Sequence, residues 1–155
     1  MTMVQVVITW SLWTVAVSVL AHLLPTSAFD HDGPITRLRE WERNGGRYEP
    51  LGVRRWKAHL PDAATLFPGG LDKRHLAVRD PEALRRLETE TRRAEVAHWA
   101  SLAIVPCCAV WSPAPTVVAL ATIAVIANGP CIVAQRYNRA RLHHVLERAA
   151  TRHPG

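Results

Sequence analysis

Charged residues are absent from two long blocks of this chain. Neither 3–24 nor 96–135 contains Asp, Glu, Lys or Arg, whereas all nineteen Lys and Arg residues lie within 37–93 or 136–152. A helix that crosses roughly 30 Å of hydrocarbon needs about 20 predominantly apolar residues. In a chain of 155 residues, which is long enough for one domain, this segregation predicts an all-α membrane protein built as a single membrane domain.

Three transmembrane helices are predicted, over about residues 3–24, 95–111 and 116–135. The second and third are separated by the sequence SPAP at 112–115, whose two prolines cannot continue a helix and therefore mark a tight turn. The rest of the chain is predicted to form an Arg-rich cytoplasmic loop over 25–94 and a cytoplasmic tail over 136–155.

The distribution of positive charge predicts the orientation in the membrane. Loops rich in Lys and Arg stay in the cytoplasm, and fourteen of the nineteen cations lie in the loop and five in the tail. The N-terminus and the SPAP turn are therefore predicted to face outward, in a multi-pass protein of the cell membrane. A cleaved signal peptide ending near Ala28 is the alternative, but the segment lacks a basic start and its apolar run is too long.

The net charge of +6 has a membrane explanation. A basic cytoplasmic face attracts anionic lipid headgroups or phosphorylated substrates, so no nucleic-acid partner is expected. Cys107, Cys108 and Cys131 lie inside the predicted spans and are read as apolar packing residues. A metal held by Glu95, His98 and His75 has too few ligands, so neither a metal nor a cofactor is expected.

Helix signals complete the predicted architecture. The loop is expected to hold short interfacial helices anchored by Trp41 and Trp56. Asp80 is a good N-cap and Pro81 suits the first helical position, so one helix should run from the loop into the second span. A separate amphipathic helix is expected over about 138–150.

Two stripes of polar residues are predicted to meet at the membrane surface. Glu95 and His98 are three residues apart on one helix face, where a carboxylate can orient and charge an imidazole that acts as a general base. On the third span, Asn128, Gln135 and Arg139 share a face. Because the SPAP turn makes the two helices antiparallel neighbours, Glu95 and His98 should come level with about Gln135.

Each of these residues also has a purely structural interpretation. Glu95 can be the last carboxylate of a solvated helix, and His98 an interfacial histidine bonded to a carbonyl. Asn128 can be a hydrogen bond between helices, and the arginines after Gln135 can serve only as a positive-inside anchor. Composition alone therefore supports a small three-span membrane protein with a polar site at the inner leaflet.

Four stretches together resemble the glycosyl-4,4'-diaponeurosporenoate acyltransferase family, small membrane enzymes of the staphyloxanthin carotenoid pathway. They are RRWKAHLPD (54–62), DKRHL (72–76), ETRRAEVAHW (90–99) and IANGPCIVAQRYNRARL (126–142). The resemblance implies transfer of a fatty acyl group to a sugar hydroxyl of a membrane glycolipid, which in that pathway is a glycosylated carotenoid acid. Another glycosylated isoprenoid or glycolipid is an alternative acceptor.

For such a transfer, the residues suggest a direct mechanism. His98, oriented by Glu95, would deprotonate the sugar hydroxyl, and Asn128 or Gln135 would donate to the developing oxyanion. A cluster of cationic and polar side chains would bind the phosphates of acyl-CoA or of the prosthetic arm of an acyl carrier protein. With Gln135, the predicted substrate-binding residues are Arg92, Arg93, Arg136, Asn138, Arg139 and Arg141.

Two other function classes remain open at this point. One is a non-catalytic membrane scaffold or helper subunit that associates with other enzymes of a lipid pathway, because such a protein also needs an Arg-rich face. The other is a reductase or methyltransferase with a nucleotide cofactor. Gly69 and Gly70 alone are too weak a signal for a phosphate-binding loop.

Overall fold

The computed structural model describes residues 1–60 and 81–152. Three long helices dominate these residues: α1 (Met3–Leu23), α3 (Pro81–Cys108) and α4 (Ala114–Arg152). The described residues between α1 and α3 form four short helical segments, and no strand is present in the described ranges. They are η1 (Thr26–Phe29), η2 (Glu40–Leu51), α2 (Val53–Trp56) and η3 (Lys57–His59). The helical prediction is confirmed, while His75 and the stretch 72–76 lie outside the described residues.

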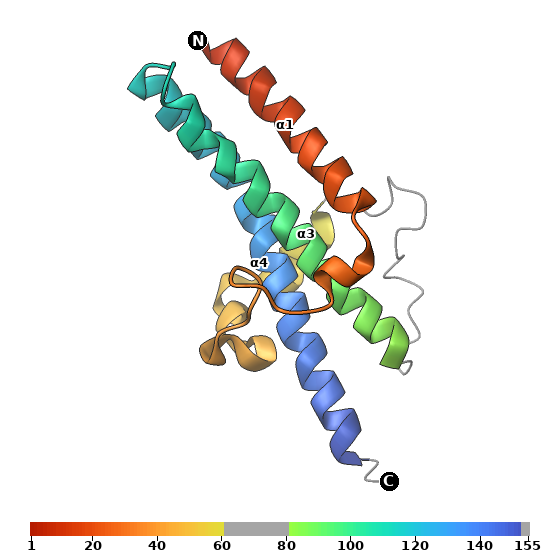
Figure 1. The fold of residues 1–155 in the computed structure, drawn as a ribbon. Helices are drawn as coiled ribbons and strands as arrows, with labels where there is room; N and C mark the ends of the chain where they lie inside the picture. Colours follow the sequence, from red (N-terminus) through yellow and green to blue (C-terminus); the bar gives the residue numbers. More distant parts are fainter. Residues whose placement is uncertain (61–80, 153–155) are drawn as a thin grey trace.

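Helix α1 packs antiparallel against α3 (Figure 1). Its first turn is closed by a capping box, in which Thr2 and Gln5 bond each other's backbone. The indole N–H groups of Trp10 and Trp13 then donate to carbonyls of α3, at 3.1 Å and 2.7 Å. The terminal amine donates to the Trp111 carbonyl at 2.8 Å, so the N-terminus and the turn between α3 and α4 lie at the same end of the bundle.

Helices α3 and α4 form an antiparallel pair around the SPAP turn, as predicted (Figure 1). Helix α3 begins at Pro81 and continues through Pro106 to Cys108, so the prediction of one helix that runs from the loop into the second apolar block is confirmed. It ends three residues before the predicted boundary at 111. Pro115 is the second residue of α4, where a missing N–H costs nothing because first-turn donors have no helical partner.

The prediction of a separate C-terminal helix is wrong. Helix α4 runs without interruption from Ala114 to Arg152, through Gly129 and Pro130 and past the predicted end at Gln135. Pro130 removes one backbone hydrogen bond but does not end the helix. After Gln135 the sequence is rich in Arg, Ala and Leu, which favour helix, and contains no Gly or Pro until position 154.

Two helices, α1 and α4, are long and apolar enough to cross a membrane; in α4 this holds for Ala114–Glu147. Only 11% and 28% of their most apolar windows are buried inside the protein, and large apolar side chains such as Leu12, Val118 and Ile126 are exposed. An exposed apolar surface of this extent fits lipid better than water. The two helices therefore indicate a membrane protein, whereas α3 does not meet the same test.

Candidate active site between α3 and α4

A histidine and an asparagine from the two antiparallel helices form a pair across their interface. His98 Nδ1 lies 2.9 Å from Asn128 Oδ1, and the Asn128 side chain is buried. The Asn128 amide nitrogen donates to the Ala124 carbonyl at 2.9 Å, which turns the amide oxygen towards the imidazole. A neutral His98 therefore carries its proton on Nδ1, and the lone pair on Nε2 is left for chemistry.

Glu95 does not pair with His98, although the two residues share a helix face. Its carboxylate is fully buried and accepts from Arg136 Nη1 at 2.6 Å and from Arg139 Nη2 at 2.5 Å. The Trp99 indole N–H adds a longer contact of 3.4 Å. Two guanidinium groups attract a carboxylate more strongly than a neutral imidazole does. The expected orientation of His98 by Glu95 is thus replaced by orientation through Asn128.

Glu42 of η2 completes this charged cluster. Arg136 binds it through two nitrogens, Nε at 2.7 Å and Nη2 at 2.6 Å, in the forked geometry that suits carboxylates. The Tyr48 hydroxyl and the Arg39 backbone N–H also donate to Glu42. Burial raises the pKa of Glu42, but these hydrogen bonds outweigh it and lower the pKa to about 2. Burial and the adjacent carboxylate of Glu42 raise the pKa of Tyr48.

The hydrogen-bonding capacity of Arg136 is completely used inside the protein. Besides Glu42 and Glu95, its guanidinium donates to the Ile35 and Arg37 carbonyls at 2.9 Å and 3.1 Å. A guanidinium has five N–H groups, and five are engaged here. The expected contact with a substrate phosphate is therefore not available to Arg136 in this arrangement.

Arg139 differs from Arg136 because part of its guanidinium has no partner. It is fully buried, and Nη2 donates to the Thr36 carbonyl and to Glu95, both at 2.5 Å. Its Nε and Nη1 are buried without a hydrogen-bond partner among the described residues. Such a group costs free energy unless something satisfies it, so Arg139 retains donors that a bound oxygen could accept from.

The other predicted cationic residues are also engaged within the protein. Arg92 donates to Asp32 at 2.8 Å and to Glu88, and Glu88 also contacts His143 at 2.6 Å. Burial raises the pKa of Glu88, but the contacts with His143 and Arg92 lower it overall. Arg93 pairs with Glu90 at 2.9 Å. Arg92 and Arg93 therefore help to fasten the start of α3.

The last three predicted residues lie on α4 near the short helices. Asn138 accepts from Lys57 Nζ at 2.6 Å, so it bonds a protein group. The exposed Arg141 side chain lies over Gly45, where an added Cβ would come within 3.1 Å of the arginine Cδ. Gln135 is half-buried, and no hydrogen bond involves its side chain in the described part of the chain.

The sequence interpretation missed Glu42, Tyr48 and Lys57. All three lie in the loop, on or beside short helices that follow no long hydrophobic period, so periodicity gave no signal for them. The acidic character of Glu42 was no signal either, because residues 25–94 contain eleven Asp and Glu residues. Within 1–60 and 81–152, no three His, Cys, Asp or Glu side chains come together as a metal site would require.

Comparison with known proteins identifies the family. The family model for glycosyl-4,4'-diaponeurosporenoate acyltransferase matches residues 25–148. A protein of that name from Staphylococcus haemolyticus (strain JCSC1435) is 30% identical, over 87% of this chain and 79% of its own length. One from Staphylococcus aureus (strain MRSA252) is 31% identical, over 93% of this chain and 89% of its own length. No solved structure matches. The chain therefore belongs to the glycosyl-4,4'-diaponeurosporenoate acyltransferase family, and it is an acyltransferase.

Proposed function

We propose that this protein transfers a fatty acyl group from an acyl thioester to a sugar hydroxyl of a membrane glycolipid. The names of its relatives support a glycosylated carotenoid acid as the acceptor. The observation that carries the mechanism is the His98–Asn128 pair, because it presents an imidazole with a free Nε2 lone pair between two apolar helices. No cofactor takes part, and the thioester is a co-substrate carried by CoA or by an acyl carrier protein.

In the proposed reaction, His98 acts as a general base. Its Nε2 removes the proton of the sugar hydroxyl while the hydroxyl oxygen attacks the thioester carbonyl. The new C–O ester bond forms, the C–S bond breaks, and the protonated imidazole returns its proton to the departing thiolate. Asn128 is a positioning residue here, because it keeps the Nδ1 proton in place and Nε2 available.

The charged cluster has a different part in this proposal. Glu42 and Glu95 hold Arg136 and Arg139 against both helices, and this arrangement fixes the position of η2 beside the site. Arg139 Nε and Nη1, together with the Gln135 amide, are the proposed donors to oxygen atoms of the bound substrates. Arg136 is structural.

For the membrane arrangement we propose three spans with an outward N-terminus and a cytoplasmic loop and C-terminus. The shared position of the N-terminus and the α3–α4 turn supports this topology. The apolar half of α3 contacts both α1 and α4, so it must lie at the same depth as they do. In this orientation the site faces the cytosol, where activated acyl groups are made.

His98→Ala tests the proposal most directly. Purified protein in lipid vesicles, supplied with a fatty acyl-CoA and a glycosylated carotenoid acid, should release free CoA and form the acylated glycolipid. His98→Ala should lower this rate by about 10²–10⁴-fold, as measured by mass spectrometry of the product.

Thr122→Val is the matched control, because Thr122 is a polar residue of α4 whose hydroxyl bonds only the Val118 carbonyl of its own helix. The control should keep the wild-type rate. Full activity of a correctly folded His98→Ala protein would remove His98 from the chemistry.

A further inference from the structure

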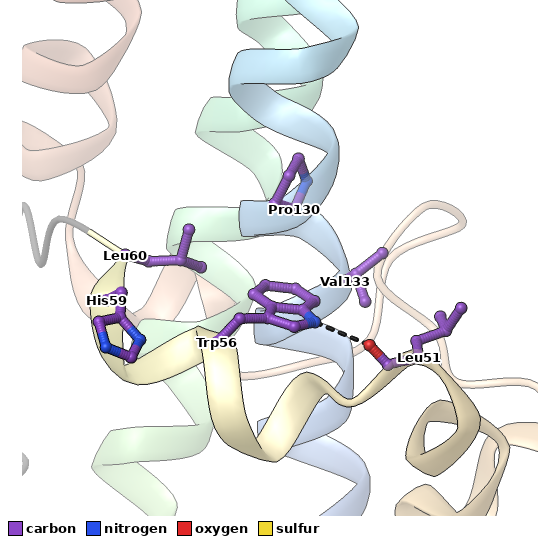
Figure 2. A pocket seen from close by; sticks show the side chains of 6 residues that line it. All are labelled: Leu51, Trp56, His59, Leu60, Pro130 and Val133. Atoms are coloured by element: carbon purple, nitrogen blue, oxygen red, sulfur yellow. Dashed lines mark hydrogen bonds between the residues drawn. The ribbon is translucent and has the colours of Figure 1, made fainter.

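An apolar groove lies beside α4, between this helix and the short helical segments. Its walls are Leu51, Trp56, His59 and Leu60 of the short helical segments and Pro130 and Val133 of α4. In Figure 2, Trp56 and Leu60 project towards α4 below Pro130, and His59 and Leu51 lie at opposite ends of the groove. The groove has a volume of about 540 Å³, within the range of about 300–1,000 Å³ that is typical of ligand sites.

The lining of the groove is almost entirely apolar. The indole N–H of Trp56 donates to the Leu51 carbonyl at 2.8 Å, so the polar atom of this ring is already satisfied and the ring offers an apolar face. Among the described residues of the lining, His59 alone is ionisable, and it is exposed. A hydrocarbon chain would gain free energy in such a groove, since burial of apolar surface is favourable.

The chain segment that supplies the outer wall of the groove is rich in cationic residues. Residues 50–60 contain Arg54, Arg55, Lys57 and His59 but no Asp or Glu. Arg54 and Arg55 are exposed, and neither side chain forms an ion pair or hydrogen bond within the described residues. The arginines of the charged cluster, by contrast, are bound to Glu42 and Glu95. An apolar groove beside free guanidinium groups suits an amphipathic ligand with an anionic head.

The groove and the His98–Asn128 pair lie on different faces of α4. Pro130 and Val133 are about 140–160° around the helix from Asn128 and at most about 8 Å from it along the axis. The side chains on the α4 surface between them, Ala127 and Cys131, are small. A chain bound in the groove can therefore extend around α4 towards His98 without meeting a large side chain of this helix.

From these observations we propose that the groove binds the hydrocarbon chain of the acyl donor, with the phosphates of its phosphopantetheine-linked head near Arg54 and Arg55. This inference rests on the proposed function, since it names the donor site of that reaction. It assigns a role to residues 54–60 of the RRWKAHLPD stretch, which the general-base mechanism does not use. Val133, in the floor of the groove, then limits the length of the chain that fits.

Val133→Trp tests the inference because it fills the groove. The affinities of the variant for hexadecanoyl-CoA and for octanoyl-CoA should be measured on purified protein in nanodiscs, without acceptor, and compared with those of the wild-type protein. We expect the affinity for hexadecanoyl-CoA to fall about tenfold or more, while that for octanoyl-CoA changes less than about twofold. Val133→Ala, which enlarges the groove, should shift the preference towards longer chains. Val118→Trp is the matched control, since Val118 is exposed on the same helix but outside the groove.

The double variant Arg54→Gln, Arg55→Gln tests the head-group site and separates the two donor sources. The double variant should bind hexadecanoyl-CoA more weakly than wild type if the phosphates of CoA lie there. It should bind hexadecanoyl-acyl carrier protein more weakly if the carrier is the donor. Unchanged binding of both thioesters would overturn the head-group assignment.

The chain site is overturned if Val133→Trp retains wild-type preference between the long and short thioesters. Because binding is measured without acceptor, this result leaves the proposed transfer reaction intact. Conversely, loss of long-chain binding supports the groove even if wild-type protein acylates no glycolipid.

Discussion

The charged cluster and the His98–Asn128 pair lie one helical turn apart on α3, yet they are built in opposite ways. In the cluster, Glu95 binds two guanidinium groups and Arg136 uses all five of its N–H groups. In the pair, a single contact holds His98, and its Nε2 keeps a free lone pair. A saturated site stabilises the fold, whereas an unsaturated site can accept a proton. Within the cluster, saturation applies to Arg136 but not to Arg139, whose Nε and Nη1 have no partner among the described residues.

The largest effect expected in the cluster is that of Glu95→Gln. It removes the charge that compensates two buried guanidinium groups, and breaking a buried ion pair in this way typically costs about 3–5 kcal/mol. The thermal unfolding temperature of the protein in detergent micelles should fall strongly. Glu82→Gln is the control, because its pair with Arg86 is exposed and exposed pairs contribute about 1 kcal/mol or less. Equal stability of the two variants would contradict the structural role of Glu95.

Asn128→Leu tests the other half of the comparison. Without the amide oxygen, His98 loses the partner that fixes its tautomer, and misplacement of a catalytic group can cost about 10²-fold in rate. We expect kcat to fall while KM stays close to the wild-type value, and the unfolding temperature to change little. Asn128→Gln, which retains an amide, should recover part of the rate. A fall in stability with unchanged kcat would instead assign Asn128 to helix packing.

Tyr48→Phe is expected to have a smaller effect on stability, and it tests whether the cluster has a structural role. The variant keeps the ring but removes the hydroxyl that donates to Glu42. A hydrogen bond to a charged group contributes about 1.5–3 kcal/mol. Because Glu42 retains Arg136 and the Arg39 N–H, the free energy of unfolding should fall by an amount near the lower end of this range. The rate of acyl transfer by the folded protein should not change, and a large change in rate would place Tyr48 in the chemistry.

Near neutral pH, the smallest expected effect is that of pH on the stability that the cluster contributes. The pKa of Glu42 is lowered from 4.5 to about 2, so its ionised form is favoured in the folded protein. A lowered pKa contributes stability that is fully present above the unfolded value and is lost as the pH falls through the folded value. The unfolding temperature of the wild-type protein should therefore change little with pH between pH 6 and 8. It should decline as the pH is lowered from about 4.5 to 2, because Glu42 is protonated in this range. An isolated decline near pH 6 would point to another group.

Helix geometry was enough to predict that polar side chains of α3 and α4 meet, and contacts such as His98–Asn128 and Glu95–Arg139 agree with it. The apolar blocks predict α1 and the α3–α4 pair, and the SPAP turn predicts that α3 and α4 are antiparallel. These features depend on local sequence, because hydrophobic length and proline act within a few residues. The same local view predicted a break after Gln135 that is absent, since the change from apolar to charged residues alters the surroundings of a helix without ending it.

The partners of the polar side chains could not be predicted in the same way. Spacing places Glu95 and His98 on one face, and from this the pairing of the two was expected. The structure instead pairs Glu95 with Arg136 and Arg139, and His98 with Asn128. Both choices depend on side chains of a different helix. The contribution of Glu42 depends on a loop segment that is 94 residues away from Arg136 in the chain.

The sequence by itself determined which segments are helical and apolar, how the main helices are joined, and the family to which the chain belongs. Only the tertiary structure decided which carboxylate neutralises which arginine, which histidine nitrogen is free, and where an apolar groove lies next to free arginines. The physical reason is one of range. Helix formation and hydrophobic length are summed along the chain, whereas each buried polar group takes the strongest partner that packing brings within about 3 Å.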